Sequence, residues 1–151
     1  EPLVGIVNAP ILGQCFEAGQ GLGARVNGAP ITVSTVADPV DALVATGFPY
    51  AIREHLDEIT TSLRAVLAAT QGIRRPGSAA LDLAYVAAGR FDAFYELALN
   101  PWDVAAGVLL VAEAGGRVTG YRPNAPYKLG DFRILASNGR LHGAMEELLA
   151  E

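Results

Sequence analysis

One change of residue pattern, near residues 35–42, constrains the fold of this chain more than any other feature. Before it, short β-branched runs end at turn signals. The strongest signal is Asn27-Gly28, a pair typical of tight hairpins. After it, strand-like runs alternate with helix-like stretches. We therefore expect an antiparallel meander over 1–36 and an α/β unit over 37–151, with a parallel or mixed sheet covered by helices.

The expected elements follow from the period of the apolar residues. The clearest helix signal covers 53–71 and places six residues on one face: Leu56, Ile59, Leu63, Val66, Leu67 and Thr70. Ser78 is a plausible N-cap for a second helix, and Asn100-Pro101 opens a third. The strands expected in the meander cover 3–7, 14–18, 23–26 and 31–33. Those expected in the α/β unit cover 43–48, 73–75, 91–96, 117–120 and 133–137, and helices cover 79–88 and 141–150.

Composition excludes several classes of protein. Hydrophobic residues make up 51% of the chain and charged residues 18%, which rules out a disordered chain. The formal net charge is −5 and no basic cluster is present, so we expect no nucleic-acid partner. No apolar run approaches the roughly 18 residues of a membrane helix, so we expect no membrane partner.

The single cysteine and the first residue indicate the setting of the chain. Cys15 stands alone, so no intrachain disulfide or thiolate metal cluster can form, and a reducing cytoplasm is the natural compartment. Residue 1 is Glu rather than Met, which indicates a chain that begins in mid-protein or has been processed or engineered.

Polar residues gather where a parallel sheet of this kind binds ligands, beyond the C-terminal ends of its strands. Asp103 stands at about the third position of the helix that Asn100 opens, where position alone favours a capping acid over a cation ligand. Glu96 ends an apolar strand and is equally a solvated acid or an acceptor for sugar hydroxyls. Gly77-Ser78-Ala79 is either a simple turn and cap or a close backbone approach to a ligand.

Other polar residues suit structural roles. The G-x-G-x-G spacing over 19–23 precedes a strand rather than a helix, so it predicts a hairpin connection and not a dinucleotide site. His55 and His142 fall on polar parts of expected helices, where solvated surface is the default. Asp38 and Asp41 flank a proline and suit turn or cap roles.

Two segments carry a family resemblance. They are 77–89 (GSAALDLAYVAAG) and 100–107 (NPWDVAAG), followed by Glu113-Ala114-Gly115-Gly116. On these motifs, and over nearly all 151 residues, the chain resembles the inositol monophosphatase family. The resemblance implies the C-terminal half of the layered α/β/α/β/α fold shared with fructose bisphosphatases. It also implies a Mg²⁺-dependent phosphatase in which a metal-activated water attacks a small polyol phosphate.

The resemblance also implies roles for individual residues. Asp103 resembles a ligand for the second metal of the family, and Glu96 resembles the glutamate that hydrogen-bonds inositol hydroxyls. Gly77, Ser78 and Ala79 resemble the loop and helix start beside the inositol ring. A homodimer in the full-length enzyme is implied in the same way.

The chain departs from the family by lacking its upstream glutamate ligand and its Asp-Pro-x-Asp-Gly-Thr block. The segment 38–42 echoes that block but lacks Gly-Thr, so we reject it as a substitute. Because magnesium needs several oxygen ligands, we expect the isolated chain to be inactive and to need a missing N-terminal half as its partner. Two alternatives remain: a catalytically silent fragment or scaffold subunit, and a phosphatase for another ester such as fructose bisphosphate or adenosine bisphosphate.

Overall fold

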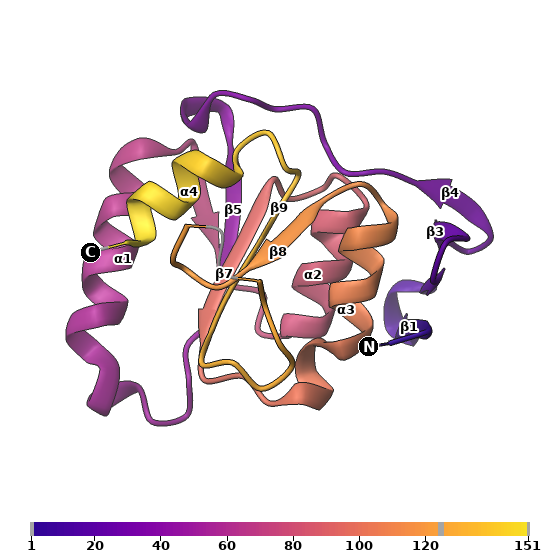
Figure 1. Cartoon of the computed structure of the whole chain (residues 1–151), viewed down its shortest axis with the longest axis horizontal. Coiled ribbons are helices and arrows are strands. Elements are labelled where there is room, and N and C mark those ends of the chain that lie inside the picture. The colour runs from indigo at the N-terminus through magenta and orange to yellow at the C-terminus, as the bar shows by residue number, and fades with distance from the viewer. Residues whose placement is uncertain (1, 124–125, 151) are drawn as a thin grey trace.

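The computed structural model describes residues 2–123 and 126–150. They stack in layers, in the order antiparallel sheet, helix pair, mixed sheet, helix pair (Figure 1). This is the α/β arrangement that the pattern change predicts. Within the described residues, no helix combines the length and the apolar character needed to cross a membrane. The division at residues 36 and 37 stays a prediction.

The first sheet is the expected meander, with neighbours in chain order. It consists of β1 (Val4–Ala9), β2 (Gln14–Gly19), β3 (Gly23–Val26) and β4 (Ala29–Ile31), all antiparallel. Asn27 and Gly28 have φ angles of 49° and 80°, which is the two-residue turn that their sequence predicts. Because Val26 pairs directly with Ala29, β4 begins before the predicted start at residue 31.

The second sheet is mixed, as predicted. Its strands are β5 (Leu43–Thr46), β6 (Gly72–Arg74), β7 (Ala93–Leu97), β8 (Arg117–Thr119) and β9 (Arg133–Ser137), in the order β6-β5-β7-β9-β8. Strand β5 runs parallel to β6 and β7, and β9 runs antiparallel to β7 and β8. The parallel part matters for function, because its strands end at a common edge beside two helix N-termini.

Helices α2 (Ala79–Ala87) and α3 (Pro101–Glu113) lie between the two sheets and form the first core. Phe16 from β2, Leu83 from α2, and Phe94 from β7 are completely buried there. The two helices approach closely at Gly107, where an added Cβ would lie 2.5 Å from the Leu83 Cβ atom. This close contact fixes how the N-termini of α2 and α3 lie relative to each other.

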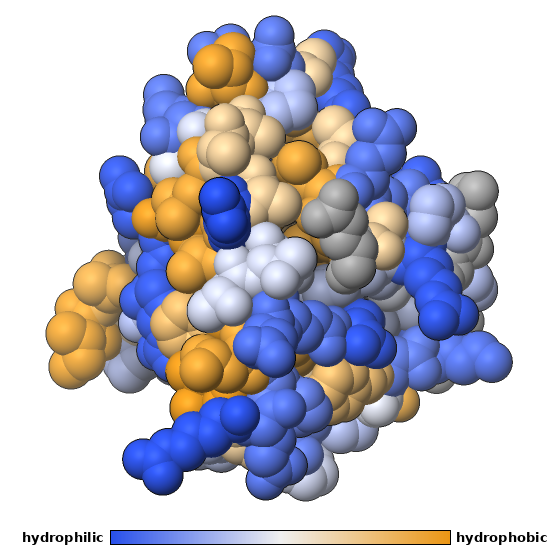
Figure 2. Space-filling model, turned by 90° about the vertical axis from the view of Figure 1, so that its left-hand side faces the viewer, coloured by the Kyte–Doolittle hydropathy of each residue, from blue (hydrophilic) through white to orange (hydrophobic). Residues whose placement is uncertain are grey.

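Helices α1 (Leu56–Ala69) and α4 (His142–Leu149) cover the other face of the mixed sheet and enclose a second core. The first turn expected in α1 is instead a 3₁₀ segment, η3 (Ile52–His55). Two residues predicted on the buried face, Leu56 and Leu67, are 50% and 52% exposed, because α1 buries only a narrow stripe. Figure 2 shows this side of the molecule, with hydrophobic residues in separate patches among hydrophilic ones.

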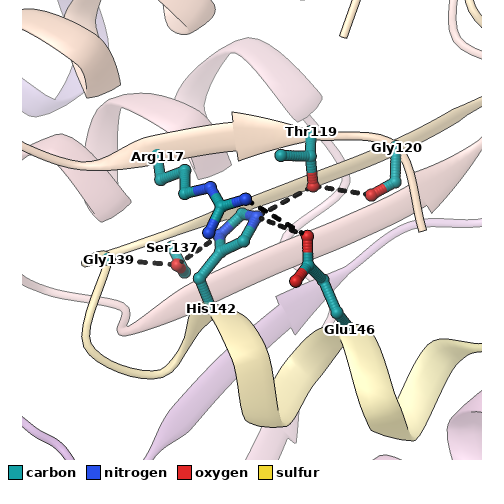
Figure 3. A network of polar contacts seen from close by, with 7 residues as sticks. All are labelled: Arg117, Thr119, Gly120, Ser137, Gly139, His142 and Glu146. Atoms are coloured by element: carbon teal, nitrogen blue, oxygen red, sulfur yellow. Dashed lines mark hydrogen bonds and ion pairs between the residues drawn. The ribbon is translucent and has the colours of Figure 1, made fainter. Parts of the chain in front are cut away.

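The prediction of a solvated His142 is wrong, because its ring is completely buried at the start of α4 (Figure 3). Thr119 and Ser137, on neighbouring strands β8 and β9, each place a hydroxyl oxygen 2.8 Å from one ring nitrogen. The polar pattern of α4 alone did not reveal these partners, which come from elsewhere in the chain.

The hydrogen bonds around His142 suit a neutral ring. The Thr119 hydroxyl donates to the Gly120 carbonyl oxygen at 2.6 Å, so it accepts from an Nε2–H group. The Ser137 hydroxyl accepts from the Gly139 N–H group at 3.1 Å and donates its own hydrogen to Nδ1. Burial and the nearby Arg117 charge lower the pKa of His142 to about 4, against the opposite effect of Glu146.

Candidate active site

A cavity of about 670 Å³ opens at the edge where the parallel strands end and the N-termini of α2 and α3 begin. Its walls come from the segment 47–52, from residues between Arg75 and Asp82, from Glu96 in β7, and from 99–103. All five residues predicted at the site line this one cavity: Gly77, Ser78, Ala79, Glu96 and Asp103. The fold therefore brings together residues that lie up to 26 positions apart in the sequence (77 to 103).

The start of α2 forms one wall of the cavity. Gly77 has a φ angle of 98°, a left-handed conformation that suits glycine, and its missing Cβ leaves room for the Arg75 guanidinium group. Ser78 caps the helix as predicted, because its hydroxyl oxygen accepts the Leu81 N–H group at 3.4 Å. The N–H groups of the first turn give this wall a partial positive charge.

Asp103 stands in the first turn of α3, where the sequence placed it. Its Oδ2 atom accepts the backbone N–H group of Asn100 at 3.0 Å, so the interpretation as a capping acid is confirmed. A carboxylate that caps a helix has further lone pairs for a cation. Capping and cation binding are therefore compatible at this residue, and the second role stays a prediction.

Glu96 lies on β7 and is only 7% exposed, although it lines the cavity. Burial, together with the charges of Asp82 and Asp103, raises the pKa of Glu96 to about 7 against the opposing charge of Arg75. Its carboxylate lies against the backbone of Gly47, where any Cβ would overlap it. Gly47 thus makes room for the position that Glu96 takes.

Gly47, Arg75 and Asp82 are among the lining residues that the sequence interpretation missed. Arg75 places its guanidinium carbon 5.5 Å from the centre of the Phe48 ring, in a cation–π contact at the cavity wall. Asp82 is 1% exposed, and burial raises the pKa of its carboxyl group to about 7 although Arg75 lowers it. The sequence could have indicated Asp82, because it lies on the same apolar face of α2 as Val86, four residues later.

The acids that the structure describes do not form a complete metal site by themselves. Among the residues that the structure describes, no group of three or more His, Cys, Asp or Glu side chains is placed to hold a metal ion. Asp103 suits magnesium as a single hard oxygen ligand, but one carboxylate does not satisfy the coordination of that ion.

Comparisons with known proteins agree with this fold. The fold matches the solved structure of inositol monophosphatase from Anabaena (Nostoc), with a TM-score of 0.95 and 44% sequence identity over 99% of this chain and 59% of that one. Such a match defines the class as the inositol monophosphatase fold. The model of the inositol monophosphatase family also matches residues 1–151, and the chain belongs to that family.

Two curated relatives are similar to this chain over part of their own length. The inositol-1-monophosphatase of Synechocystis is 44% identical over 149 residues, which cover 99% of this chain and 52% of that protein. The Nus factor SuhB of Escherichia coli is 42% identical over 142 residues, or 94% of this chain and 53% of that protein. The chain thus spans about half the length of the curated relatives it matches.

Proposed function

We propose that this chain supplies the polyol-binding wall and one magnesium ligand of a phosphatase that hydrolyses inositol monophosphate. The observation that supports the proposal is the meeting of Glu96, Asp103 and the Gly77-Ser78-Ala79 helix start on one cavity. One carboxylate does not satisfy magnesium, so the proposal takes the remaining ligands from the half of the relatives' length that this chain does not cover.

Different residues of the chain would bind the polyol ring and the phosphate group of the substrate. Glu96 has a pKa near neutrality, so its carboxyl group can accept a hydrogen bond from a ring hydroxyl or donate one. The start of α2 at Gly77-Ser78-Ala79 lines the same cavity and would lie beside the polyol ring. Asp103 would hold magnesium, which when bound activates a water molecule and offsets the charge of the phosphate.

Phosphate release from myo-inositol 1-phosphate tests the proposal. The assay compares the complete gene product that contains these residues with the 151-residue chain, at increasing magnesium concentration. We expect magnesium-dependent release by the complete product and none by the chain alone. A complete product without magnesium-dependent release from this or another small phosphate ester contradicts the proposal. Fructose bisphosphate and adenosine bisphosphate, assayed in parallel, determine which ester is preferred.

A second candidate is a catalytically silent subunit of the same fold. The relatives called Nus factor SuhB support it, since that name describes a factor rather than an enzyme. This candidate predicts no phosphate release even when an N-terminal half from a relative is added. A gain of activity on adding that half excludes it.

The proposal also includes the assembly and the compartment. The family resemblance implies a homodimer of the full-length enzyme, and the lone Cys15 indicates a reducing cytoplasm. Analytical ultracentrifugation of the complete product tests the first expectation, and cell fractionation tests the second. A purely monomeric product at assay concentration contradicts the dimer.

A further inference from the structure

We propose that Asp82 is a specificity-determining residue of the cavity, whose carboxyl group hydrogen-bonds a hydroxyl group of the polyol ligand beside Glu96. The inference rests on the proposed function for the class of ligand, but not for the existence of the site. The supporting observation is that Asp82 is a buried acid that lines the cavity and has no hydrogen-bond partner in the described part of the chain.

The first argument is the lack of hydrogen-bond partners. Neither oxygen of Asp82 has one among residues 2–123 and 126–150, although the residue is 1% exposed. Buried polar groups in folded proteins are nearly always paired, and an unpaired one needs an explanation. A ligand that enters from the cavity is such an explanation.

Asp92 shows what a structural buried acid looks like in the same fold. It is 7% exposed, and its two oxygens accept the Ser34 hydroxyl at 2.5 Å and the Leu43 N–H group at 2.7 Å. Asp92 thus ties the segment before β5 to the start of β7. The oxygens of Asp82 form no hydrogen bond that links described segments, so a role in stabilising the fold does not explain why a buried acid stands at this position.

The position of Asp82 in α2 does not account for it either. Acids in the first turn of a helix usually accept backbone N–H groups, but in α2 the Leu81 N–H group is bonded to the Ser78 hydroxyl. The raised pKa of Asp82 agrees, because burial outweighs both the helix N-terminus and the charge of Arg75. The native state therefore favours a neutral carboxyl group.

The neighbours of Asp82 define the ligand chemistry. Asp82 and Glu96 are both buried at the cavity, and the charge of Asp82 makes Glu96 harder to ionise. A phosphate group is repelled by two acids, whereas an uncharged polyol offers hydroxyls that both donate and accept hydrogen bonds. The two carboxyl groups therefore suit adjacent hydroxyls of one polyol ring.

The test uses variants of Asp82 in the complete gene product, with Asp92 as the matched control. Asp82→Leu keeps the size of the side chain and removes its polar atoms, and Asp82→Asn keeps its shape. We expect the ratio of kcat/KM for myo-inositol 1-phosphate to kcat/KM for glycerol 2-phosphate to fall about tenfold or more in Asp82→Leu, the loss expected for one buried hydrogen bond. We expect a smaller fall in Asp82→Asn and an unchanged ratio in Asp92→Asn.

Stability separates a ligand-binding role from a structural one. Because Asp82 has no described partner in the fold, Asp82→Leu should unfold at the same temperature as the wild type or at a higher one. Asp92→Asn should unfold at a lower temperature, because it disturbs two hydrogen bonds. A clear loss of stability in Asp82→Leu with an unchanged substrate ratio overturns the inference.

A binding measurement keeps the inference distinct from the proposed function. If the wild-type product releases no phosphate, the proposed function fails, and NMR titration of the 151-residue chain with myo-inositol then decides the role of Asp82. Binding that weakens about tenfold in Asp82→Leu supports the inference. Equal binding by both proteins, or no binding by the wild type, overturns it.

Discussion

Acid should destabilise this fold through His142, and the size of the effect follows from its surroundings. The pKa of the ring falls from 6.5 in an unfolded chain to about 4 in the native state. A lowered pKa in the native state means that the stabilisation is complete above the unfolded value and is lost as the pH falls through the native one. The shift corresponds to about 3 kcal/mol, and the ring is completely buried, so solvent does not screen it.

The physical cause of this shift is the hydrogen-bond network shown in Figure 3. A second proton on Nδ1 would leave the Ser137 hydroxyl hydrogen without its acceptor. Glu146 lies 3.6 Å from Nε2 and favours a charged ring, but burial and the Arg117 charge outweigh it. The neutral ring therefore joins α4 to strands β8 and β9.

The assay is urea unfolding of the wild type and of His142→Gln at several pH values. The free energy of unfolding of the wild type minus that of the variant should shrink by about 2–3 kcal/mol between about pH 7 and about pH 4.5. Asp82 and Glu96 act in the opposite direction, since their raised pKa values stabilise the native state as the pH falls. They contribute equally to both proteins, so the difference isolates His142. A constant difference refutes this account, and a growing one means that the ring is charged.

Two glycine substitutions test packing and site geometry. Gly107→Ala places a Cβ atom 2.5 Å from the Leu83 Cβ atom, so it should lower the free energy of unfolding, measured in urea, by about 1–3 kcal/mol. Gly143→Ala is the control, because nothing lies within 4 Å of its added Cβ atom, and it should not lower this free energy. Gly47→Ala overlaps the Glu96 carboxylate, a flexible group that can move, so the melting temperature should change little while kcat/KM for the inositol ester falls about tenfold. Unchanged kcat/KM in Gly47→Ala would show that the position of Glu96 is unimportant.

The parts of the fold set by local sequence were predictable. The Asn27-Gly28 turn needs only two residues that accept positive φ angles, and it determines the β3–β4 pairing. The start of α2 at Ser78 and that of α3 at Asn100 follow from capping chemistry in the same way. Together with the strand expected to end at Glu96, these two helix starts predict one ligand-binding edge of the sheet, and the cavity lies there.

The features that sequence patterns did not reveal depend on contacts between distant segments. The burial of His142 requires Thr119, 23 residues away, and the role of Gly47 appears only where β5 meets the side chain of Glu96. Asp82 is different, because an acid on an apolar helix face is visible in the sequence. Its lack of a partner is visible only in the folded protein.

The role of Asp103 is the central claim, and the magnesium dependence of phosphate release by the complete gene product tests it most directly. Asp103→Asn should raise the magnesium concentration needed for half-maximal activity by about tenfold or more and should strongly lower turnover. The fold should remain, since a first-turn charge contributes about 1 kcal/mol or less. Asp57→Asn, at the first turn of α1 and outside the cavity, is the matched control. Unchanged activity of Asp103→Asn at saturating magnesium would contradict the account and leave Asp103 as a helix cap alone.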